Sequence, residues 1–263
     1  MVKAIILAAG MGTRLGNYTK DLPKGMLNFN GKSLIERQIE ILKSCNIHNI
    51  IIVTGFKPEK INFTGVKYVH NKEYDTTNMV ASLFSAEAEF TEEIIVCYSD
   101  IIYEKSVIKN VLEAKANIGV VVDENYLDYW KARSADWKND VESLVINNNE
   151  IIDLGNTKCS LKEAKERYVG IIKFSTKGIQ NLKKYFHKNK KLYWDKDEKW
   201  KRSKSFKKAY MTCMLQELID NNIIVSPIII QHGWMEFDTV EDYDKAIKWL
   251  KEGSINRFID IKK

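Results

Sequence analysis

The sequence contains little proline and glycine, and it has no long uninterrupted apolar run. With three prolines and thirteen glycines in 263 residues there is no low-complexity linker, so we expect a single domain over residues 1–263. No run approaches the roughly 18 apolar residues that a membrane span needs. The first apolar run is short and is soon interrupted by Gly10, Gly12 and Arg14, which favours a first strand over a signal peptide.

Cysteine and histidine are also scarce. Cys45, Cys97, Cys159 and Cys213 are scattered without a C-x-x-C pair, which is typical of reduced thiols in the cytoplasm and argues against a disulfide framework. The four histidines have no zinc-ligand spacing. We therefore expect a cytoplasmic protein without structural zinc.

Positive charge is concentrated in one stretch of the chain. The formal net charge is +6, but Lys183–Lys208 holds twelve Lys or Arg and three Asp or Glu, which leaves about −3 for the remainder. Aromatic residues are interleaved with these cations. The pattern is compatible with polynucleotide binding, with a solvated insertion or subunit contact, or with a flap over an anionic active site.

The N-terminal apolar run leads into a glycine-bearing turn and two cations. Residues Val2–Leu7 are followed by Gly10 and Gly12, and then by Arg14 and Lys24. Glycine lets the backbone approach a ligand closely, and free N–H groups in such a turn attract anions. Arginine and lysine neutralise phosphate charge. The stretch therefore predicts a buried strand that ends in a phosphate-binding loop.

Two commoner phosphate-binding loops do not fit this stretch. A dinucleotide-binding turn requires G-x-G-x-x-G, but Leu15 occupies the third glycine position. A P-loop requires G-x-x-x-x-G-K-[ST]; Gly31-Lys32-Ser33 supplies its second half, but its first glycine would fall at Met26. The remaining pattern is G-x-G-T-R-L followed by P-K.

This pattern resembles the signature of nucleotidyltransferases that join a nucleoside triphosphate to a phosphorylated small molecule. These include sugar-1-phosphate nucleotidylyltransferases and small cytidylyltransferases such as those for phosphocholine. The resemblance implies that a phosphate or phosphonate oxygen attacks the α-phosphorus, and that Arg14 and Lys24 are catalytic. The nucleotide-binding residues that it implies are Leu7, Ala8, Ala9, Gly10, Met11, Gly12, Thr13, Arg14, Lys24, Asn78, Ser82 and Asp100.

The segment Tyr74–Leu83 is where the resemblance places the base. Its N-x-x-x-S-L form, with Asn78 and Ser82, is similar to the cytidylyltransferase branch rather than the sugar branch. Asn78 and Ser82 offer donors and acceptors for a base edge or ribose. The alternative is that they only cap a helix and are otherwise ordinary surface polar residues.

Two carboxylates are the implied magnesium ligands. Asp100 follows the apolar run 94–98, where family members carry a metal-binding Asp, often as D-x-D; here the second Asp is absent. The stretch Gly233–Tyr243 resembles the closing motif of the family, in which Asp238 matches the second ligand. Asp238 or Thr239 is alternatively a helix N-cap, and both roles can hold together.

The acceptor site is expected between these motifs. The segment 123–133 follows a predicted strand end and mixes carboxylates, aromatics and cations, which suits an amine through cation–π attraction; half-buried packing is the alternative. The resemblance adds Gly170, where a side chain would block approach. Glu236 alternates with Asp238 along an extended strand, so both side chains can face the same side, and Glu236 is a candidate to hold either the acceptor or the metal. The expected acceptor-binding residues are Asp123, Tyr129, Trp130, Lys131, Arg133, Gly170 and Glu236.

Strand-like and helix-like segments alternate over the first half of the chain. This rhythm predicts an α/β fold: a mainly parallel, Rossmann-like mixed sheet flanked by helices. The resemblance implies a GT-A-like nucleotidyltransferase domain with no C-terminal β-helix. We expect helices over 33–45, 78–90, 106–116, 175–187, 206–221 and 239–251. The expected nucleotide-binding part is 1–122 and 233–252, and the acceptor-binding part is 123–232.

The resemblance leads to a specific functional hypothesis. It implies a magnesium-dependent enzyme that transfers CMP from CTP to a small phosphorylated, amine-bearing acceptor such as phosphocholine, aminoethylphosphonate or a phospho-amino acid. We expect CTP and this acceptor as partners, no nucleic acid or membrane partner, and a possible homodimer. The alternatives are a sugar-1-phosphate nucleotidylyltransferase that uses UTP or dTTP, and a polynucleotide-binding module built on Lys183–Lys208. The joint presence of Arg14, Lys24, Asp100 and Asp238 argues against a catalytically dead paralogue.

Overall fold

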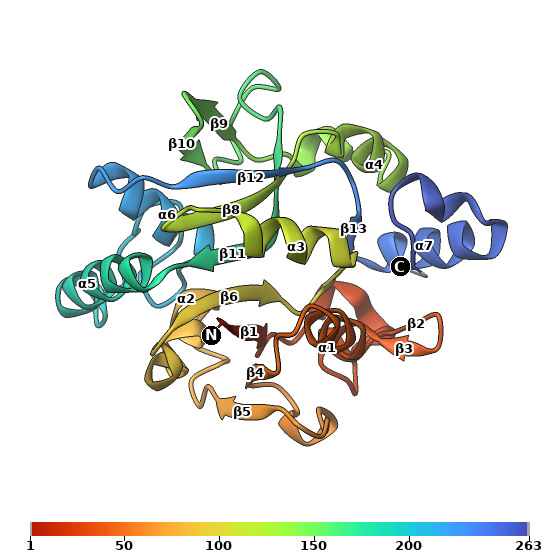
Figure 1. Ribbon diagram of the computed structural model, residues 1–263, viewed down its shortest axis with the longest axis horizontal. Coiled ribbons are helices and arrows are strands. Elements are labelled where there is room, and N and C mark those ends of the chain that lie inside the picture. Colours follow the sequence, from red (N-terminus) through yellow and green to blue (C-terminus); the bar gives the residue numbers. More distant parts are fainter. Residues whose placement is uncertain (1, 262–263) are drawn as a thin grey trace.

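A seven-stranded sheet forms the centre of the computed structural model, which describes residues 2–261 (Figure 1). The strand order is β12-β8-β11-β6-β1-β4-β5. Only β11 runs antiparallel to its neighbours in this sheet, which confirms the predicted mixed, mainly parallel architecture. The strands are β1 Val2–Ala8, β4 Asn49–Thr54, β5 Lys67–His70, β6 Glu93–Tyr98, β8 Ile118–Asp123, β11 Arg167–Phe174 and β12 Ser226–Ile230.

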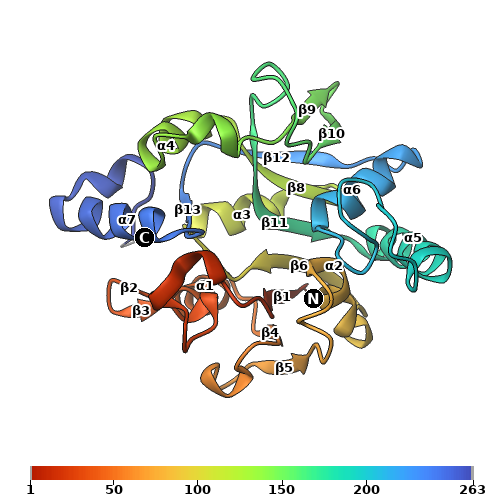
Figure 2. The same cartoon turned by 180° about the vertical axis from the view of Figure 1, so that it is seen from behind.

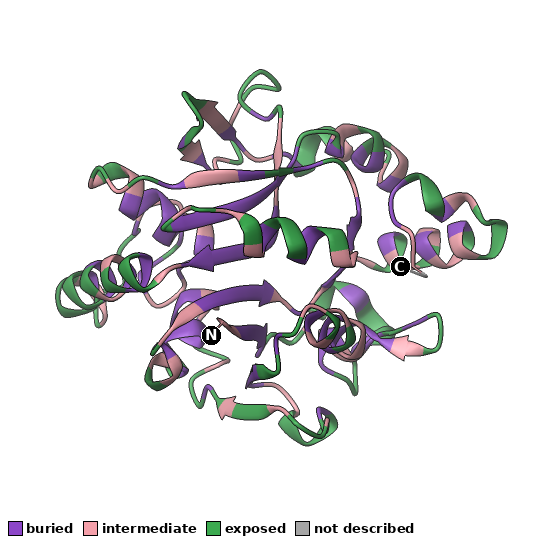
Figure 3. Ribbon diagram, viewed as in Figure 1, coloured by how far each residue is buried: buried purple, intermediate pink, exposed green. Residues whose placement is uncertain are grey.

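Helices cover both faces of this sheet. Helices α1 (Leu34–Ser44) and α3 (Lys105–Glu113) lie on the face seen in Figure 1. Figure 2 shows α2 (Met79–Ser85) and α6 (Met211–Asp220) on the opposite face, with α5 (Thr176–Tyr193) at its side. Neighbouring residues of β1 contribute to the two different core clusters, because successive strand side chains point to opposite faces. The central strands are accordingly buried along nearly their whole length (Figure 3).

A short ladder joins two distant parts of the chain. Strand β7 (Ile101–Tyr103) pairs antiparallel with β13 (Trp234–Glu236), and Glu236 lies opposite Ile101. The backbone N–H of Phe237 also donates to the carbonyl of Asp100 at 3.0 Å. Since Asp100 precedes β7 and Asp238 follows β13, the ladder brings the two predicted metal ligands side by side.

The remaining elements frame the carboxyl ends of the parallel strands. Helices α4 (Tyr126–Arg133) and α7 (Val240–Glu252) lie next to each other beyond this edge (Figure 1). Two short antiparallel pairs lie outside the central sheet: β9 (Leu144–Asn147) with β10 (Glu150–Leu154), and β2 (Asn28–Phe29) with β3 (Lys32–Ser33).

Several element boundaries differ from those expected. Helix α5 continues to Tyr193 rather than ending at residue 187, and the buried Asn189, which donates to Glu217, extends its inner face by one turn. Helix α6 begins at Met211 rather than Phe206, since Ser205 and Phe206 accept turn hydrogen bonds instead. Helix α4 was not expected at all. No helix within residues 2–261 combines the length and the hydrophobicity needed to cross a bilayer.

Candidate active site

In the glycine-bearing loop after β1, Gly12 adopts a left-handed backbone conformation and packs against Lys24. Gly12 has φ +66°, and its carbonyl accepts hydrogen bonds from Leu15 N at 3.0 Å and Thr19 Oγ1 at 2.8 Å. A Cβ atom at this position would lie 2.9 Å from Cβ of Lys24. Glycine is therefore required both for the backbone conformation and for the close packing of Lys24 against the loop.

Lys24 lies between the two carboxylates that the β7–β13 ladder brings together. Its ammonium forms ion pairs with Asp100 and Asp238, and Asp238 also accepts from Arg14 at 3.0 Å. The side chain of Lys24 is 12% exposed, whereas that of Arg14 is 65% exposed. The sequence-predicted residues Arg14, Lys24, Asp100 and Asp238 thus form one cluster, although 224 positions separate the first from the last.

Electrostatic interactions within this cluster keep Lys24 and Asp238 charged. Burial alone lowers the pKa of Lys24, but attraction from Asp100 and Asp238 outweighs burial and raises that pKa above its usual value. Burial likewise raises the pKa of Asp238, but Lys24 and Arg14 outweigh it and hold that pKa well below the usual range. Asp100 and Asp238 therefore present two carboxylates that converge on one cation position.

Two converging carboxylates fit a magnesium ion. Mg²⁺ is usually bound by one or two carboxylates, together with substrate phosphate oxygens and waters. No group of three or more His, Cys, Asp or Glu side chains in the described chain is arranged as a complete metal site. A metal at Asp100 and Asp238 would accordingly share its remaining coordination with substrate.

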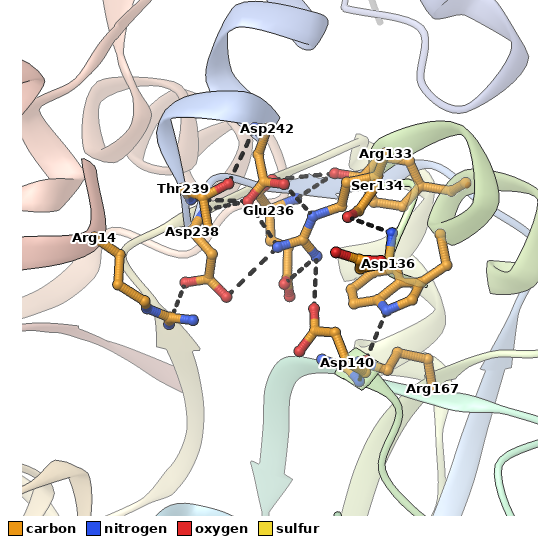
Figure 4. A network of polar contacts seen from close by, with 12 residues as sticks. Arg14, Arg133, Ser134, Asp136, Asp140, Arg167, Glu236, Asp238, Thr239 and Asp242 are labelled. Atoms are coloured by element: carbon orange, nitrogen blue, oxygen red, sulfur yellow. Dashed lines mark hydrogen bonds and ion pairs between the residues drawn. The ribbon is translucent and has the colours of Figure 1, made fainter. Parts of the chain in front are cut away.

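Arg133 fixes the stretch that carries Asp238 (Figure 4). It donates to both carboxylate oxygens of Asp242, at 2.7 and 2.8 Å, and it pairs with Glu236. Its guanidinium also lies 3.6 Å from Asp238. Asp242 in turn accepts from the backbone N–H groups of Asp238 and Thr239, at 3.0 and 2.8 Å. Arg133 therefore acts as a positioning residue for the start of α7.

Glu236 is a largely buried carboxylate of the network, with a side chain that is 13% exposed. Burial is the largest influence and raises its pKa to about 7, against the opposing attraction of Arg133. The hydroxyl of Tyr129 holds its backbone, accepting from Glu236 N at 3.2 Å and donating to Glu236 O at 3.1 Å. Glu236 is therefore fixed at both its main chain and its side chain.

A cavity of about 150 Å³ lies beside Lys24 and Asp100. Predicted residues Leu7, Ala9 and Gly10 form one wall, and Asn78 and Ser82 form another. Asn78 also caps α2, accepting from Met79 N at 2.8 Å, so the alternative capping role is present as well. Tyr74, Thr77 and Met79, from the segment that the resemblance assigns to the base, also line it. The lining residues that the sequence did not indicate are Tyr98 and Ser99.

Five of the predicted nucleotide-binding residues do not line this cavity: Ala8, Met11, Gly12, Thr13 and Arg14, of which Arg14 lines the larger cavity described below. Ala8 points into the opposite core cluster, because neighbouring residues on β1 face opposite sides. Met11 and Thr13 are exposed on the loop.

A larger cavity of about 480 Å³ lies on the other side of Asp100 and Asp238. Arg14, Gly170 and Glu236 line it, as expected. Gly170 has φ +86°, and a Cβ atom there would lie 2.9 Å from the ring of Tyr98. A larger residue would consequently disturb the wall of this cavity. Met79 and Arg202 also line it and belong to the predicted base segment and to the basic stretch, and Tyr168 and Val169 directly precede the predicted Gly170. The residues that the sequence did not indicate are Tyr98, Glu142, Gly155, Thr157, Arg167, Tyr210 and Thr212.

The predicted acceptor segment 123–133 does not line this cavity. Tyr129 and Trp130 are each 1% exposed and pack in the core, so they offer no open aromatic surface to an amine. Asp123 is fully buried and accepts from Trp234 Nε1 at 2.8 Å. Lys131 faces a different cavity, beside Asp128.

These residues do not line the larger cavity because Tyr126–Arg133 forms helix α4. Tyr126, Tyr129, Trp130 and Arg133 of α4 are all buried. Trp130 nevertheless contributes indirectly, because the guanidinium of Arg167 lies 4.2 Å from its ring centroid. Arg167 lies three residues before Gly170, which was predicted to be part of the acceptor site.

Comparison with known proteins bears directly on this site. Residues 4–149 match the family model described as the MobA-like NTP transferase domain. The chain belongs to this family. The prediction of a nucleotidyltransferase is therefore confirmed, and the loop after β1, Asp100 and the 150 Å³ cavity all draw on the matched part of the transferase.

Relatives match the transferase along its length. The CTP:phosphoglutamine cytidylyltransferase of Campylobacter jejuni is 32% identical over 259 residues, covering 94% of this chain and all of the relative. The choline-phosphate cytidylyltransferase of Streptococcus pneumoniae is 32% identical over 149 residues, covering 55% of this chain and 64% of the relative. The solved CTP:phosphocholine cytidylyltransferase of Streptococcus pneumoniae shares the fold, with a TM-score of 0.71 at 24% identity over 95% of this chain and 99% of that one.

Proposed function

We propose that this transferase moves CMP from CTP to a small phosphorylated or phosphonate acceptor that carries an amine, and releases pyrophosphate. The observation that carries the proposal is the position of Lys24, Asp100 and Asp238 at the junction of two cavities. The relative from Campylobacter jejuni and the structural neighbour from Streptococcus pneumoniae are both cytidylyltransferases by name. The smaller cavity suits the nucleotide base and the larger cavity suits the acceptor.

In this proposal the nucleotide is bound by the loop after β1 and by α2. The polar groups of Asn78 and Ser82 face the base, while Arg14 and Lys24 neutralise the triphosphate. Asp100 and Asp238 would hold Mg²⁺, which when bound polarises the phosphoryl oxygens and shields their charge. A cytoplasmic location and magnesium dependence belong to the proposal.

The acceptor cavity contains two charged side chains without an ionic partner among residues 2–261. Arg167 donates only to the carbonyl of Asp140, at 3.1 Å, and stacks on Trp130, while Glu142 has no hydrogen bond or ion pair. Arg167 suits the acceptor phosphate, and Glu142 suits an ammonium. This replaces the aromatic pocket expected from the sequence.

The chemistry requires no side-chain nucleophile. A phosphate or phosphonate oxygen of the acceptor attacks the α-phosphorus, a new P–O bond forms, and the bond to the β-phosphate bridging oxygen breaks with pyrophosphate as the leaving group. Two anions must approach each other, so Arg14, Lys24 and Arg167 supply charge neutralisation and in-line orientation.

Pyrophosphate release tests the proposal. We expect release with CTP and Mg²⁺ in the presence of phosphocholine, aminoethylphosphonate or a phospho-amino acid, and much less with ATP, UTP or dTTP. Turnover with glucose-1-phosphate and UTP, but none with CTP, would instead identify a sugar-1-phosphate nucleotidylyltransferase.

The variant Asp238→Asn tests the metal role. We expect it to lower kcat by about 100-fold or more, because removing a ligand weakens charge stabilisation worth several kcal/mol. Asp128→Asn is the matched control, since Asp128 is exposed on α4 and faces another cavity. Near-normal activity of Asp238→Asn would show that Asp238 serves only to begin α7.

A further inference from the structure

The segment from Trp200 to Thr212 lies against both cavities. The backbone N–H groups of Asn78 and Val80, beside the nucleotide cavity, donate to carbonyls of Lys207 and Ala209 at 3.0 and 3.3 Å. The same segment supplies three lining residues of the acceptor cavity: Arg202, Tyr210 and Thr212. The basic stretch predicted from the sequence therefore reaches the acceptor site.

Arg202 is fixed in this cavity. It is the one arginine among the twelve basic residues of Lys183–Lys208. Its guanidinium donates to the carbonyl of Leu154 and to the carboxylate of Asp153, and Asp153 also accepts from Ser143 Oγ. These two bonds leave three of the five guanidinium N–H donors. The guanidinium of Arg202 is thus fixed in position and keeps three N–H donors for a ligand.

Glu142 lies at the same end of the cavity as Arg202. Its neighbour Ser143 exchanges backbone hydrogen bonds with Gly155 and Asn156, at 2.8 and 3.0 Å, directly after the carbonyl that binds Arg202. Gly155 has φ +79°, and a Cβ atom there would lie 2.7 Å from Thr212 Cβ. This end of the cavity therefore carries one anion and one cation at fixed backbone positions.

We propose that Glu142 and Arg202 bind the head of the acceptor, and that this head is an amino-acid zwitterion with both an ammonium and a carboxylate. The proposal rests on the function proposed above and specifies its acceptor class. The ammonium lies at Glu142, the carboxylate lies at Arg202, and the phosphate points toward Arg14 and Asp238 at the other end.

The charges favour this head over a simple amine. Ethanolamine or choline phosphate satisfies Glu142, but it leaves the remaining donors of Arg202 in a filled cavity without an acceptor. Leaving a polar group desolvated and unpaired is costly, and more so for a charged group. A carboxylate removes that cost and forms the planar two-bond pair that arginine prefers.

Matched acceptors test the proposal with CTP and Mg²⁺. O-phospho-L-serine and O-phosphoethanolamine differ only by the carboxylate, and O-phospho-L-serine and 3-phosphoglycerate differ only by amine against hydroxyl. O-phospho-L-homoserine with 3-aminopropyl phosphate repeats the carboxylate comparison one methylene longer. We expect kcat/KM to be about 10- to 100-fold higher for the zwitterion of the better-fitting pair, as loss of one charge-assisted hydrogen bond implies.

Substitutions of Arg202 and Glu142 test which group of the acceptor each side chain binds. Arg202→Gln should bring the ratio of kcat/KM for the carboxylate-bearing acceptor to kcat/KM for its decarboxylated analogue down to about one, and Arg202→Lys should give an intermediate ratio. Glu142→Gln should abolish the preference for the amine. Lys204→Gln is the matched control, because Lys204 is exposed two residues away. A thermal unfolding midpoint for each variant separates misfolding from altered specificity.

The outcomes distinguish this proposal from the proposed function. Equal kcat/KM for acceptors with and without the carboxylate, or an Arg202→Gln variant that lowers both alike, would overturn the zwitterion proposal and leave CMP transfer intact. No pyrophosphate release from CTP with any phosphorylated amine would overturn the proposed function, and this proposal with it.

Discussion

Lys24 is the residue on which the charge balance of the site depends. Its ammonium occupies the position between Asp100 and Asp238 where a divalent cation would be bound. The lysine therefore acts as an internal counter-ion, and under the proposed function it would release the carboxylates when nucleotide and metal enter.

Replacing Lys24 by Met should separate these two roles. We expect kcat to fall by about 100-fold or more, because one preorganised group that stabilises the transferring phosphoryl is lost. We also expect Mn²⁺ alone to bind more tightly, since the two carboxylates lose their competing cation. Steady-state kinetics and Mn²⁺ titration by electron paramagnetic resonance measure the two effects. Lys20→Met, at an exposed lysine near the loop, is the control. Weaker Mn²⁺ binding in Lys24→Met would contradict the counter-ion role.

Arg133 is the second residue with a large expected effect. Arg133→Met leaves Asp242 and Glu236 buried without their cation, so we expect the free energy of unfolding to fall by about 3–5 kcal/mol. Arg257→Met should cost under about 1 kcal/mol, because Arg257 is exposed and only stacks on Trp249 and Phe258. Urea unfolding compares the two variants. Equal losses would contradict the buried network.

At the scale of elements, α1 and α7 begin with the same capping box. Ser33 accepts from Glu36 N at 3.2 Å, and Thr239 accepts from Asp242 N at 3.2 Å. In each helix the third residue returns a hydrogen bond to the cap. Only the cap of α7 adjoins a predicted metal ligand, Asp238.

These two caps give a matched pair of variants. Ser33→Ala and Thr239→Val should each lower the free energy of unfolding by about 1 kcal/mol. Only Thr239→Val should also lower kcat, because it loosens the backbone that carries Asp238. Unfolding curves and pyrophosphate release measure stability and activity separately. If both variants lost activity equally, the cap of α7 would have no special role.

The elements also show what sequence patterns can and cannot predict. Strand β1, the capping box of α1 and the ends of β6 were predictable, because each follows from local periodicity or a local cap. Helix α4 was not, since Tyr129, Trp130 and Arg133 face different buried neighbours and give no amphipathic pattern. The acceptor residues Glu142 and Arg202 belong to irregular connections, and only the tertiary fold brings them together.

At the scale of the whole molecule, the predicted nucleotide site joins the ends of the central strands β1 and β6 to α2 and to the distant Asp238. CTP with Mg²⁺ should therefore stabilise the entire fold. At a CTP concentration of 100 times Kd we expect the free energy of unfolding to rise by about 2.7 kcal/mol. Thermal unfolding with increasing CTP, compared with UTP, measures this effect, and Asp238→Asn should reduce it. Equal stabilisation by both nucleotides would argue against cytidine preference.

The fold also changes how the basic stretch Lys183–Lys208 is interpreted. Tyr185, Phe186 and Trp200 are buried against the core, so their rings are not available to stack on the bases of a polynucleotide. The exposed lysines lie on the outside of α5 and the following turn, whereas Arg202 points into the acceptor cavity. The stretch thus belongs partly to the acceptor site.

The contact of segment 200–212 with both cavities has a thermodynamic consequence. Any adjustment of this segment that favours one substrate also changes the free energy of binding the other, because the carbonyls of Lys207 and Ala209 bind the start of α2. Such coupling is reciprocal: the factor by which the acceptor changes the dissociation constant of CTP equals the factor by which CTP changes that of the acceptor. The two substrates of this transferase therefore form a linked binding cycle rather than two independent equilibria.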